Sequence, residues 1–372
     1  MKLSLCLPVL FRPGIFQRAG IRIVVSFLLS TIGLSVGIAQ TSSQPDPFNQ
    51  VSGPEFSAVV KAVSQNDYDL ALKLSSDLRR DAIKTRNREL QSEVIATIKE
   101  VNRLKREFHK LGSVYELMQK SKDPEACRTI GNFYCLDKGD WQAGLKLLTK
   151  SDSPDLQATA AADLKRPVTP EEQAKLADAW WKVAEKEKGV TRKAYLLRGR
   201  YWYLLARPRL PAIECVDRNK KLLQIPLSSD KIVIWNQHNG EYANHGTDEC
   251  IVTLLYQGKS VWRQVVRVPW KPDAPAYRVI RPPNVRFDQI KVDITKYLKK
   301  GGGLGEIEVF DGTINLVQNS SAFAKEYHGN ERTFHPSNVI DGDKSGATGF
   351  WLLNRQHTGW VAIDLVNQLE QP

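Results

Sequence analysis

The spacing of apolar residues changes once along this chain, near Pro226. Between residues 55 and 225, apolar side chains recur every three or four positions, and Gly and Pro are confined to a few junctions. That spacing is typical of amphipathic helices. Beyond Pro226, short runs of β-branched and aromatic residues alternate with Gly, Pro and Asn, as in antiparallel strands. The pattern predicts an α + β multidomain protein, with a helical domain at 55–225 and a β-sandwich at 226–372.

Five runs in the second half have the composition of strands. They lie at 231–235, 250–256, 260–268, 285–294 and 306–310. Two polar stretches between them, 237–247 and 269–283, are expected to form long loops.

A heptad-like spacing marks one stretch of the helical half. Its apolar positions are Val94, Val101, Leu104, Phe108, Leu111, Tyr115 and Met118. Such a spacing predicts a seam against one neighbouring helix, broken or bent near Gly112. The neighbour is either another helix of the same chain, which we favour over so short a span, or a second copy.

Residues 124–155 carry the pattern of a two-helix repeat. The first helix would contain Ile130, Gly131 and Tyr134, the second Ala143 and Leu147, with Pro154 after it. Small residues at Gly131 and Ala143 would let the two helices approach closely. This stretch resembles a tetratricopeptide repeat, and 66–72, 174–181 and 194–206 read as parts of further repeats. The resemblance implies a helical array with a concave face for a protein partner.

Five aromatic residues stand close together in the last part of this array: Trp180, Trp181, Tyr201, Trp202 and Tyr203. They could line a groove on the concave face. Aromatic residues at helical spacing usually pack in the core, so we expect most of them to be buried.

Residues 1–39 have the organisation of a secretory signal. Four basic residues and no acid are followed by an apolar run at 23–39, which closes on Gly37, Ile38 and Ala39. Cleavage after Ala39 would leave a polar linker at 40–54 and no membrane span, whereas an uncleaved segment would act as an anchor. We expect export and cleavage, which places the protein outside the cell, in the periplasm or in the envelope.

The charge of the chain is basic, with a formal net charge of +12. Subtracting the four cations of residues 1–39 leaves +8, a moderate excess that suits anionic envelope polymers. Nucleic acid is not expected as a partner, because no dense Lys/Arg tract with interleaved aromatics occurs. The longest basic stretch, 79–88, reads as the solvated face of a helix.

The end of the chain carries a distinctive acidic turn. Asn338, Asp341 and Asp343 are followed by Trp351 and by the strand-like run 360–365, and an earlier run at 302–310 is rich in Gly and then β-branched. The later segment is similar to the first half of a discoidin-type, galactose-binding-like jelly roll, and the earlier one to its last half. The inverted order implies one circularly permuted sandwich. The alternative is one module at 226–311 and a truncated second module at 313–372.

The resemblance implies a structural calcium ion. Its ligands would be the side chains of Asp341, Asp343 and Glu306, with backbone carbonyls from Asn338 and Gly305. Gly346 stands where a Ser or Thr ligand is usual, and Ser345 or Thr348 are the possible substitutes. Without a metal, the Asp-Gly-Asp sequence would be an ordinary turn.

The resemblance also implies that loops at one end of the sandwich bind carbohydrate or another cell-surface ligand. The candidate residues are His238, Asn239, Tyr242, His245, Trp270, Arg355 and His357. Trp270 would offer a ring face to a sugar, whereas Trp235, Trp351 and Trp360 are assigned to the core. Zinc at His238 and His245 is not expected, because no third ligand accompanies them.

No spacing in the chain is typical of a catalytic site. The acids of the helical half are scattered, His109 is isolated, and no glycine-rich phosphate loop precedes a helix. Cys127 and Cys135 are too far apart along one helix to pair, and whether Cys215 pairs with Cys250 is left open. We therefore expect an exported binding protein without enzymatic activity. The alternatives are an accessory fragment of a larger exported enzyme, such as a glycoside hydrolase, and a structural envelope scaffold.

Overall fold

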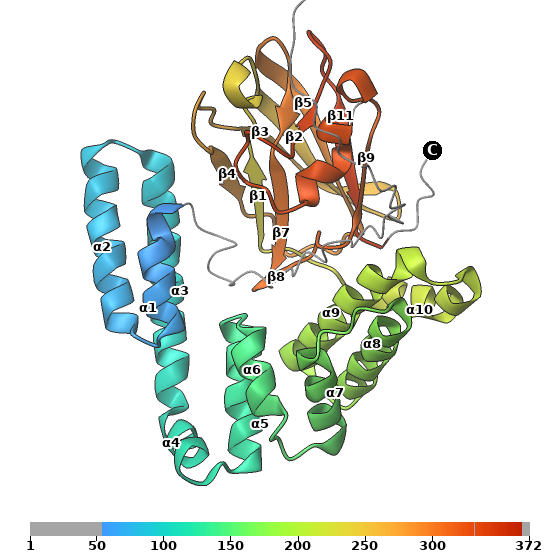
Figure 1. Ribbon diagram of the computed structural model, residues 1–372. Helices are drawn as coiled ribbons and strands as arrows, with labels where there is room; N and C mark the ends of the chain where they lie inside the picture. Colours follow the sequence, from blue (N-terminus) through green and yellow to red (C-terminus); the bar gives the residue numbers. More distant parts are fainter. Residues whose placement is uncertain (1–53, 331, 367–372) are drawn as a thin grey trace, which may run out of the picture. The chain divides into compact units, whose positions relative to one another are not determined.

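A computed structural model describes residues 54–330 and 332–366 (Figure 1). The predicted secretory signal at 1–39 and all of the linker except Pro54 lie outside the described residues. The described helical part consists of α1 (Ser57–Ser64), α2 (Tyr68–Lys84), α3 (Arg88–Lys110), α4 (Gly112–Ser121), α5 (Pro124–Asn132), α6 (Trp141–Leu148), α7 (Pro154–Leu164), α8 (Pro170–Glu185), α9 (Gly189–Ala206) and α10 (Ala212–Gln224). No helix within the described ranges has the length and apolar character needed to cross a bilayer.

Polar side chains just before the helices explain where several of them begin. Asp67, Asn87, Asp123, Asp140, Ser153 and Thr169 each accept a hydrogen bond from the backbone N–H three residues later. Such caps satisfy donors that the first turn of a helix leaves unpaired. Three of these residues are followed by a proline, which favours the first position of a helix.

The heptad-like stretch forms an intramolecular seam. Val101 and Leu104 of α3 are fully buried against Tyr68 and Ala71 of α2. Helix α3 ends at Lys110 and α4 begins at Gly112, so the helix breaks where the sequence predicts it.

Helices α5 and α6 approach each other closely at glycine, but not through the predicted pair. A single π-helical turn, Phe133–Asp137, extends α5. A side chain at Gly144 would lie 2.3 Å from Cys135 Sγ and 2.7 Å from the carbonyl oxygen of Gly131. Gly144 therefore makes the contact that was predicted for Ala143. Ala143 stands one position earlier and is only half-buried.

The aromatic residues of α8 and α9 are mostly core. Trp180, Trp181, Trp202 and Tyr203 are buried, and only Tyr201 is half-exposed. A groove lined by all five is therefore not formed. Asp163 of α7, 1% exposed, is surrounded by four N–H donors of this core, from Trp180, Trp202 and Arg198.

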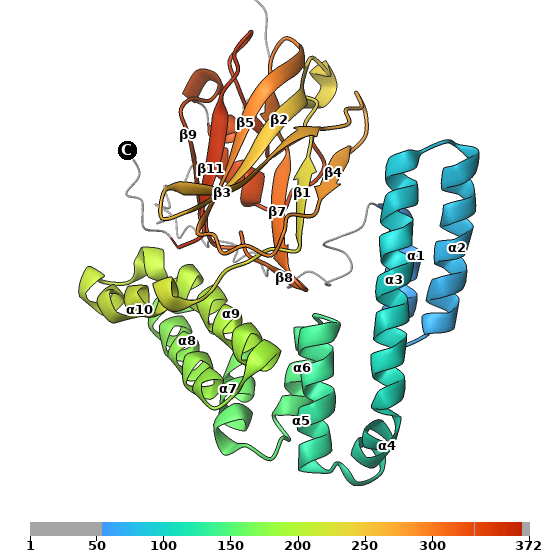
Figure 2. The same cartoon turned by 180° about the vertical axis from the view of Figure 1, so that it is seen from behind.

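The β part contains two larger antiparallel sheets and one strand pair (Figures 1 and 2). The first sheet has the order β4 (Tyr277–Ile280), β1 (Lys231–Trp235), β7 (Glu306–Asp311), β8 (Ile314–Asn315). The second has the order β3 (Lys259–Arg267), β2 (His245–Tyr256), β5 (Gln289–Lys299), β11 (Trp360–Asp364), β9 (Ser321–Ala324). The pair joins β6 (Gly303–Leu304) to β10 (Trp351–Leu352).

Two differences from the predicted strands concern the polar stretches. Strand β4 lies inside 269–283, and β2 begins at His245, inside 237–247. Backbone pairing decides both cases, because β4 bonds to β1 and the first residues of β2 bond to β5. The hydrophobic composition of a segment does not predict which strand it will pair with.

The segments before and after residue 312 contribute to the same sheets. Strand β11 pairs with β5, with Ile363 opposite Ile290, and β10 pairs with β6. Residues 226–311 and 313–366 therefore do not fold as separate modules within the described part of the chain. Gly303 has φ 151°, and a side chain there would lie 2.3 Å from the carbonyl oxygen of Trp351, so the pairing with β10 requires glycine.

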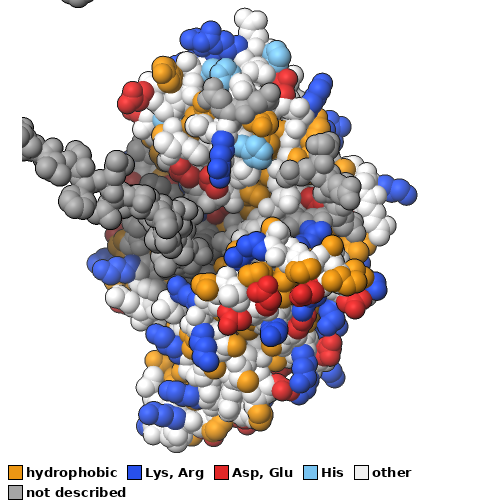
Figure 3. Space-filling model, turned by 45° about the vertical axis from the view of Figure 1, so that its right-hand side comes forward, with side chains coloured by type: hydrophobic (Ala, Val, Ile, Leu, Met, Phe, Trp, Pro, Cys, Tyr) orange, Lys and Arg blue, Asp and Glu red, His pale blue; other side chains and the backbone are white. Residues whose placement is uncertain are grey.

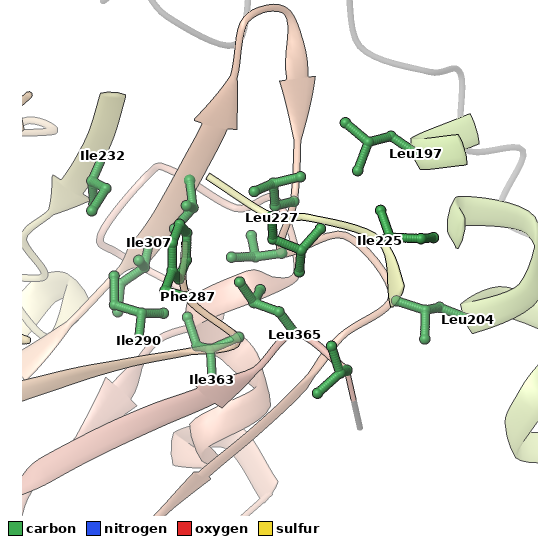
Figure 4. Close-up of a cluster of buried hydrophobic side chains, with 14 of the residues drawn as sticks. Leu197, Leu204, Ile225, Leu227, Ile232, Phe287, Ile290, Ile307, Ile363 and Leu365 are labelled. Carbon is green, nitrogen blue, oxygen red and sulfur yellow. The ribbon is translucent and has the colours of Figure 1, made fainter. Parts of the chain in front are cut away.

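The apolar core runs from the sheets into the helices (Figure 4). Ile232 and Ile307 of the first sheet and Ile290 and Ile363 of the second belong to one buried cluster, so the two sheets pack face to face. The same cluster includes Leu197 and Leu204 of α9, Ile225 and Leu227 of the segment after α10, and Leu365 after β11, so it joins the helices to the sheets (Figure 4). The four described cysteines, Cys127, Cys135, Cys215 and Cys250, are buried and free.

Candidate functional site

The acidic turn packs against the strand that carries Glu306. Glu306 Oε2 accepts a hydrogen bond of 3.2 Å from the backbone N–H of Gly342, although the two residues are 36 positions apart. The adjacent Glu308 binds Lys344 of the same turn at 2.8 Å and Trp235 Nε1 at 2.9 Å. Both glutamates are 2% exposed. The turn is therefore tied to β7 by buried polar contacts.

The carboxyl groups of this turn lie in an environment that opposes their ionisation. Burial, with the charges of Glu308 and Asp341, raises the pKa of Glu306 well above its ordinary value. Burial, with the charge of Asp343, raises the pKa of Asp341 to about 6. A cation at this place would reverse both effects, because it favours ionised carboxylates.

The donor set fits calcium only in part. Asp341 Oδ2 and Asp343 Oδ2 lie close to the same place, 3.0 and 3.1 Å from where Gly349 would carry a side chain. Asp343 Oδ2 also accepts a hydrogen bond of 2.7 Å from Thr348 Oγ1. Thr348, which was predicted to replace the ligand missing at Gly346, therefore lies at this turn. Over the described ranges, no three His, Cys, Asp or Glu side chains gather as a metal site. Calcium takes much of its shell from carbonyls and water, so the ion stays a prediction.

A cluster of polar side chains lies beside this turn, at the start of β2. Asn236 is 2% exposed and uses its whole amide: Nδ2 donates to the carbonyls of Thr247 and Pro269, and Oδ1 accepts from the N–H groups of Gln237 and Thr247. These bonds fix the chain direction after β1. They leave Gln237 pointing inward, 0% exposed, and its Oε1 and Nε2 atoms have no partner within the described residues.

His245 presents a second buried polar atom. The ring is 3% exposed, and Nδ1 lies 2.5 Å from Asn244 Oδ1. With the ring proton on Nδ1, Nε2 is a hydrogen-bond acceptor, and it has no partner in the described part of the chain. Burial, together with electrostatic repulsion from His328, Arg355 and Lys300, lowers the pKa of His245 to about 4, so the ring is neutral near pH 7.

The unpaired atoms of Gln237 and His245 lie close to the glycine-rich segment 301–303. A side chain at Gly303 would lie 3.0 Å from Gln237 Nε2, and one at Gly301 would lie 3.2 Å from His245 Nε2. His328, whose Nδ1 is also buried without a partner in the described residues, lies near enough to influence the pKa of His245. Buried polar atoms are nearly always paired, so this group implies water or a ligand.

Trp270 connects the two segments. Its Nε1 lies 3.0 Å from the carbonyl oxygen of Gln237 and 2.9 Å from that of His245. The ring is half-buried against Gly246, and Lys299 Nζ lies 4.6 Å from the ring centroid. Stacking of a sugar on this ring therefore requires displacement of Lys299.

The structure brings together only some of the predicted ligand residues. Asn239 lies at His245, with its Nδ2 2.6 Å from Asn244 Oδ1, and the exposed Arg355 is near enough to affect the His245 charge. Tyr242 is 77% exposed, and His357 is bound to Glu326 at 2.6 Å. His238 is buried, and its Nδ1 lies 3.1 Å from the carbonyl oxygen of Gly240. His357 and His238 therefore make contacts other than with the unpaired atoms of Gln237 and His245, and Tyr242 faces solvent.

The segment that carries the polar cluster is in direct contact with the acidic turn. The backbone N–H of His238 donates to the carbonyl oxygen of Gly346 at 2.9 Å, and Gly346 packs on Asn236. On the face shown in Figure 3, histidine and basic side chains lie together over the upper part of the molecule, which is the β part. Anything that orders the acidic turn would therefore also order the segment that carries Gln237.

Sequence reasoning missed Gln237 and His328. Gln237 stands in the polar stretch 237–247, which was expected to form a loop, and neither residue belongs to a motif. The run of three glycines at 301–303 is the one feature that pointed to a close approach of side chains. Of the residues assigned to the core, Trp235 and Trp351 are buried, whereas Trp360 is half-buried and packs on Phe323.

Comparison of the chain with protein-family models, with curated proteins and with solved structures found no match.

Proposed function

We propose that this is an exported binding protein without catalytic activity, whose β-sandwich attaches to carbohydrate at the cell surface or envelope. The tetratricopeptide-like helices would dock a protein partner. We also propose that the sandwich is of the discoidin-like, galactose-binding type. It is supported by the joining of β10 and β11 to β6 and β5.

One observation carries the carbohydrate proposal: Gln237 is fully buried with both amide atoms unpaired, beside the unpaired Nε2 of neutral His245. A sugar hydroxyl both donates and accepts a hydrogen bond. It therefore matches an amide that offers both functions and an imidazole nitrogen that accepts. An unpaired buried amide is costly by itself, and a ligand that pairs it gains that free energy on binding.

The electrostatics favour an uncharged or anionic sugar over a cationic one. Lys299 lies over the ring of Trp270, and Lys300 and Arg355 are near enough to His245 to lower its pKa. This agrees with the basic excess of the chain. The polar cluster thus suits neutral or acidic envelope polysaccharides.

Calcium has a supporting role in this proposal. Asp341, Asp343 and Glu306 would bind it through side chains, and Asn338 and Gly305 through their carbonyl oxygens. When bound, the ion neutralises the crowded carboxylates of the turn. The residues of the chain then keep the turn against Asn236 and so position Gln237.

The helical part offers exposed apolar side chains to a partner. Ile213 at the start of α10 is 81% exposed, and Val168 in the loop before α8 is 70% exposed. Arg209, four positions before Ile213, donates a hydrogen bond of 3.3 Å to the carbonyl oxygen of Val168. The side chains of Val168 and Ile213 therefore belong to one surface. Figure 3 shows apolar side chains interspersed with charges over the helical part.

A substitution at Gln237 tests the carbohydrate proposal. Gln237→Met keeps the length of the side chain and removes both hydrogen-bonding atoms. We expect retention on polysaccharide beads, competed by free sugar, to weaken at least about tenfold, while thermal stability is unchanged or higher because an unpaired buried amide is lost.

The matched control is Gln264→Met on the exposed strand β3, which should bind like the wild type. If the wild type retains no glycan from a diverse array, or if Gln237→Met binds as well as Gln264→Met, the polar cluster is structural. The envelope scaffold would then be the better reading.

A further inference from the structure

A small pocket lies where α9 meets the turn that follows β7. Its volume is about 40 Å³, and its walls come from both the helical and the β part. The lining includes polar side chains of 313–318 and the aromatic rings of Trp141 and Tyr201. A cavity needs about 10–15 Å³ to hold one water molecule, so this one can hold several, or one small ion.

Arg200 gives the pocket a buried positive charge. The residue is 3% exposed, and its guanidinium donates to the carbonyl oxygen of Leu365 and, at 3.1 Å, to Ser320 Oγ. No carboxylate of the described chain lies within salt-bridge distance of Arg200, whereas buried arginines usually have such a partner. Burial lowers the pKa of Arg200 to about 9, and the more distant charge of Asp364 opposes this only in part.

The second arginine of the pocket differs in this respect. Arg198 Nε lies 2.8 Å from Asp163 Oδ2, and the guanidinium stacks on Trp141 at 4.7 Å. Its charge is therefore neutralised. Among the residues that line the pocket there is no Asp or Glu. The net charge of the walls is positive, and the charge without a counter-ion belongs to Arg200.

The remaining polar groups can donate hydrogen bonds. Asn315 Oδ1 is occupied by the N–H groups of Val309 and Val317, so its NH₂ group is the free end of the amide. The half-buried Gln318 side chain makes no hydrogen bond within the described part of the chain. An arginine and two amide NH₂ groups around a space large enough for a small ion are the donors that an oxyanion requires.

We propose that this pocket binds a compact oxyanion, either phosphate or the carboxylate group of a small acid. Arg200 provides the charge, and Gln318 and Asn315 provide further donors. Because α9 and the turn after β7 both line the pocket, the anion stabilises the packing of the helices on the sandwich. This site is distinct from the polar cluster at Gln237 and does not depend on carbohydrate binding.

Thermal unfolding in added anions tests the proposal. Phosphate or acetate is titrated against chloride at equal ionic strength. We expect the Tm of the wild type to rise with the logarithm of anion concentration, because the anion binds the native state alone. A rise with phosphate only identifies a tetrahedral ligand, and a rise with acetate identifies a carboxylate.

Gln318→Glu is the discriminating variant, because it places a negative charge in the pocket with no change in side-chain length. We expect its anion affinity to fall at least about tenfold while its Tm in chloride is kept. Gln264→Glu on β3 adds the same charge at an exposed place and should respond like the wild type. An equal Tm rise in Gln318→Glu and the wild type, or no rise above chloride in the wild type, overturns the proposal.

Discussion

Glu306 Oε2 and the backbone N–H of Gly342 are joined by a hydrogen bond of 3.2 Å. The bond connects β7, in the middle of the first sheet, to a turn formed 36 residues later. Glu306 has almost no contact with solvent, so this N–H is one of the few groups that can stabilise its charge. The two segments whose order along the chain suggested a permuted sandwich are therefore in direct contact.

Calcium is expected to stabilise the protein through this turn. Titration of Ca²⁺ into metal-free protein should raise Tm with the logarithm of the ion concentration. Asp343→Asn should lose most of this response, since it removes one carboxylate, whereas Asp273→Asn in an exposed loop should keep it. Melting curves recorded with calcium and with a chelator decide the matter. Superimposable curves would show that the acidic turn is stable without a metal.

Breaking the buried ion pair of the helical core should be severely destabilising. Asp163→Asn keeps the shape of the side chain but leaves Arg198 charged in the core, 6% exposed. We expect the free energy of unfolding in urea to fall by about 3–5 kcal/mol. Asp217→Asn, which removes an exposed partner of Lys220, should leave the midpoint unchanged. Equal effects of the two substitutions would mean that Arg198 finds another partner or water.

The close approach of α5 and α6 should not tolerate a side chain. Gly144→Ala places a methyl group 2.3 Å from Cys135 Sγ, and we expect a loss of about 1–3 kcal/mol in the free energy of unfolding. Gly112→Ala is the matched control, because nothing lies within 4 Å of its new methyl group. Alanine there should be neutral or stabilising by up to about 1 kcal/mol. A stable Gly144→Ala protein would contradict the observed packing.

Lys231 should make stability rise with pH in an alkaline window. Burial lowers the pKa of this amine from 10.5 to about 8, although Asp230, Glu308 and Glu93 favour its charge and Arg281 opposes it. Between these two values the unfolded chain binds the proton more tightly than the native protein does. The free energy of unfolding of the wild type should therefore increase relative to Lys231→Met, by at most about 1.4 kcal/mol per pH unit.

Urea unfolding of both proteins across pH 8–10.5 measures the difference. A constant or shrinking difference would show that the Lys231 amine titrates normally.

The local pattern was sufficient to predict much of the secondary structure. Cap residues such as Asp123 and Ser153, each with a following proline, mark helix starts through short-range hydrogen bonds. The break before Gly112 and the strand at 231–235 follow from the same kind of local information. Strand β4 was missed because its polar and proline-rich surroundings read as a loop, and only pairing with β1 makes it a strand.

The candidate site could be predicted only in outline. The acidic turn and His245 were recognisable by residue type, and the approach of Glu306 to the turn followed from the family resemblance. Gln237 could not be identified, because its significance lies in complete burial without partners. That property depends on Asn236 and Trp270, which hold the neighbouring backbone. The anion pocket is likewise invisible in the sequence, since Arg200 and Gln318 are 118 positions apart.

The sequence by itself determined the change from helical to strand period, the break near Gly112 and the positive charge. These depend on propensity, capping and composition, which act over a few residues. Only the tertiary structure decided that β11 joins β5, that Gly144 rather than Ala143 faces Cys135, and which polar atoms stay unpaired. Such outcomes depend on which distant segments exclude water together, and hydrogen-bond satisfaction in a core is a property of the whole packed chain.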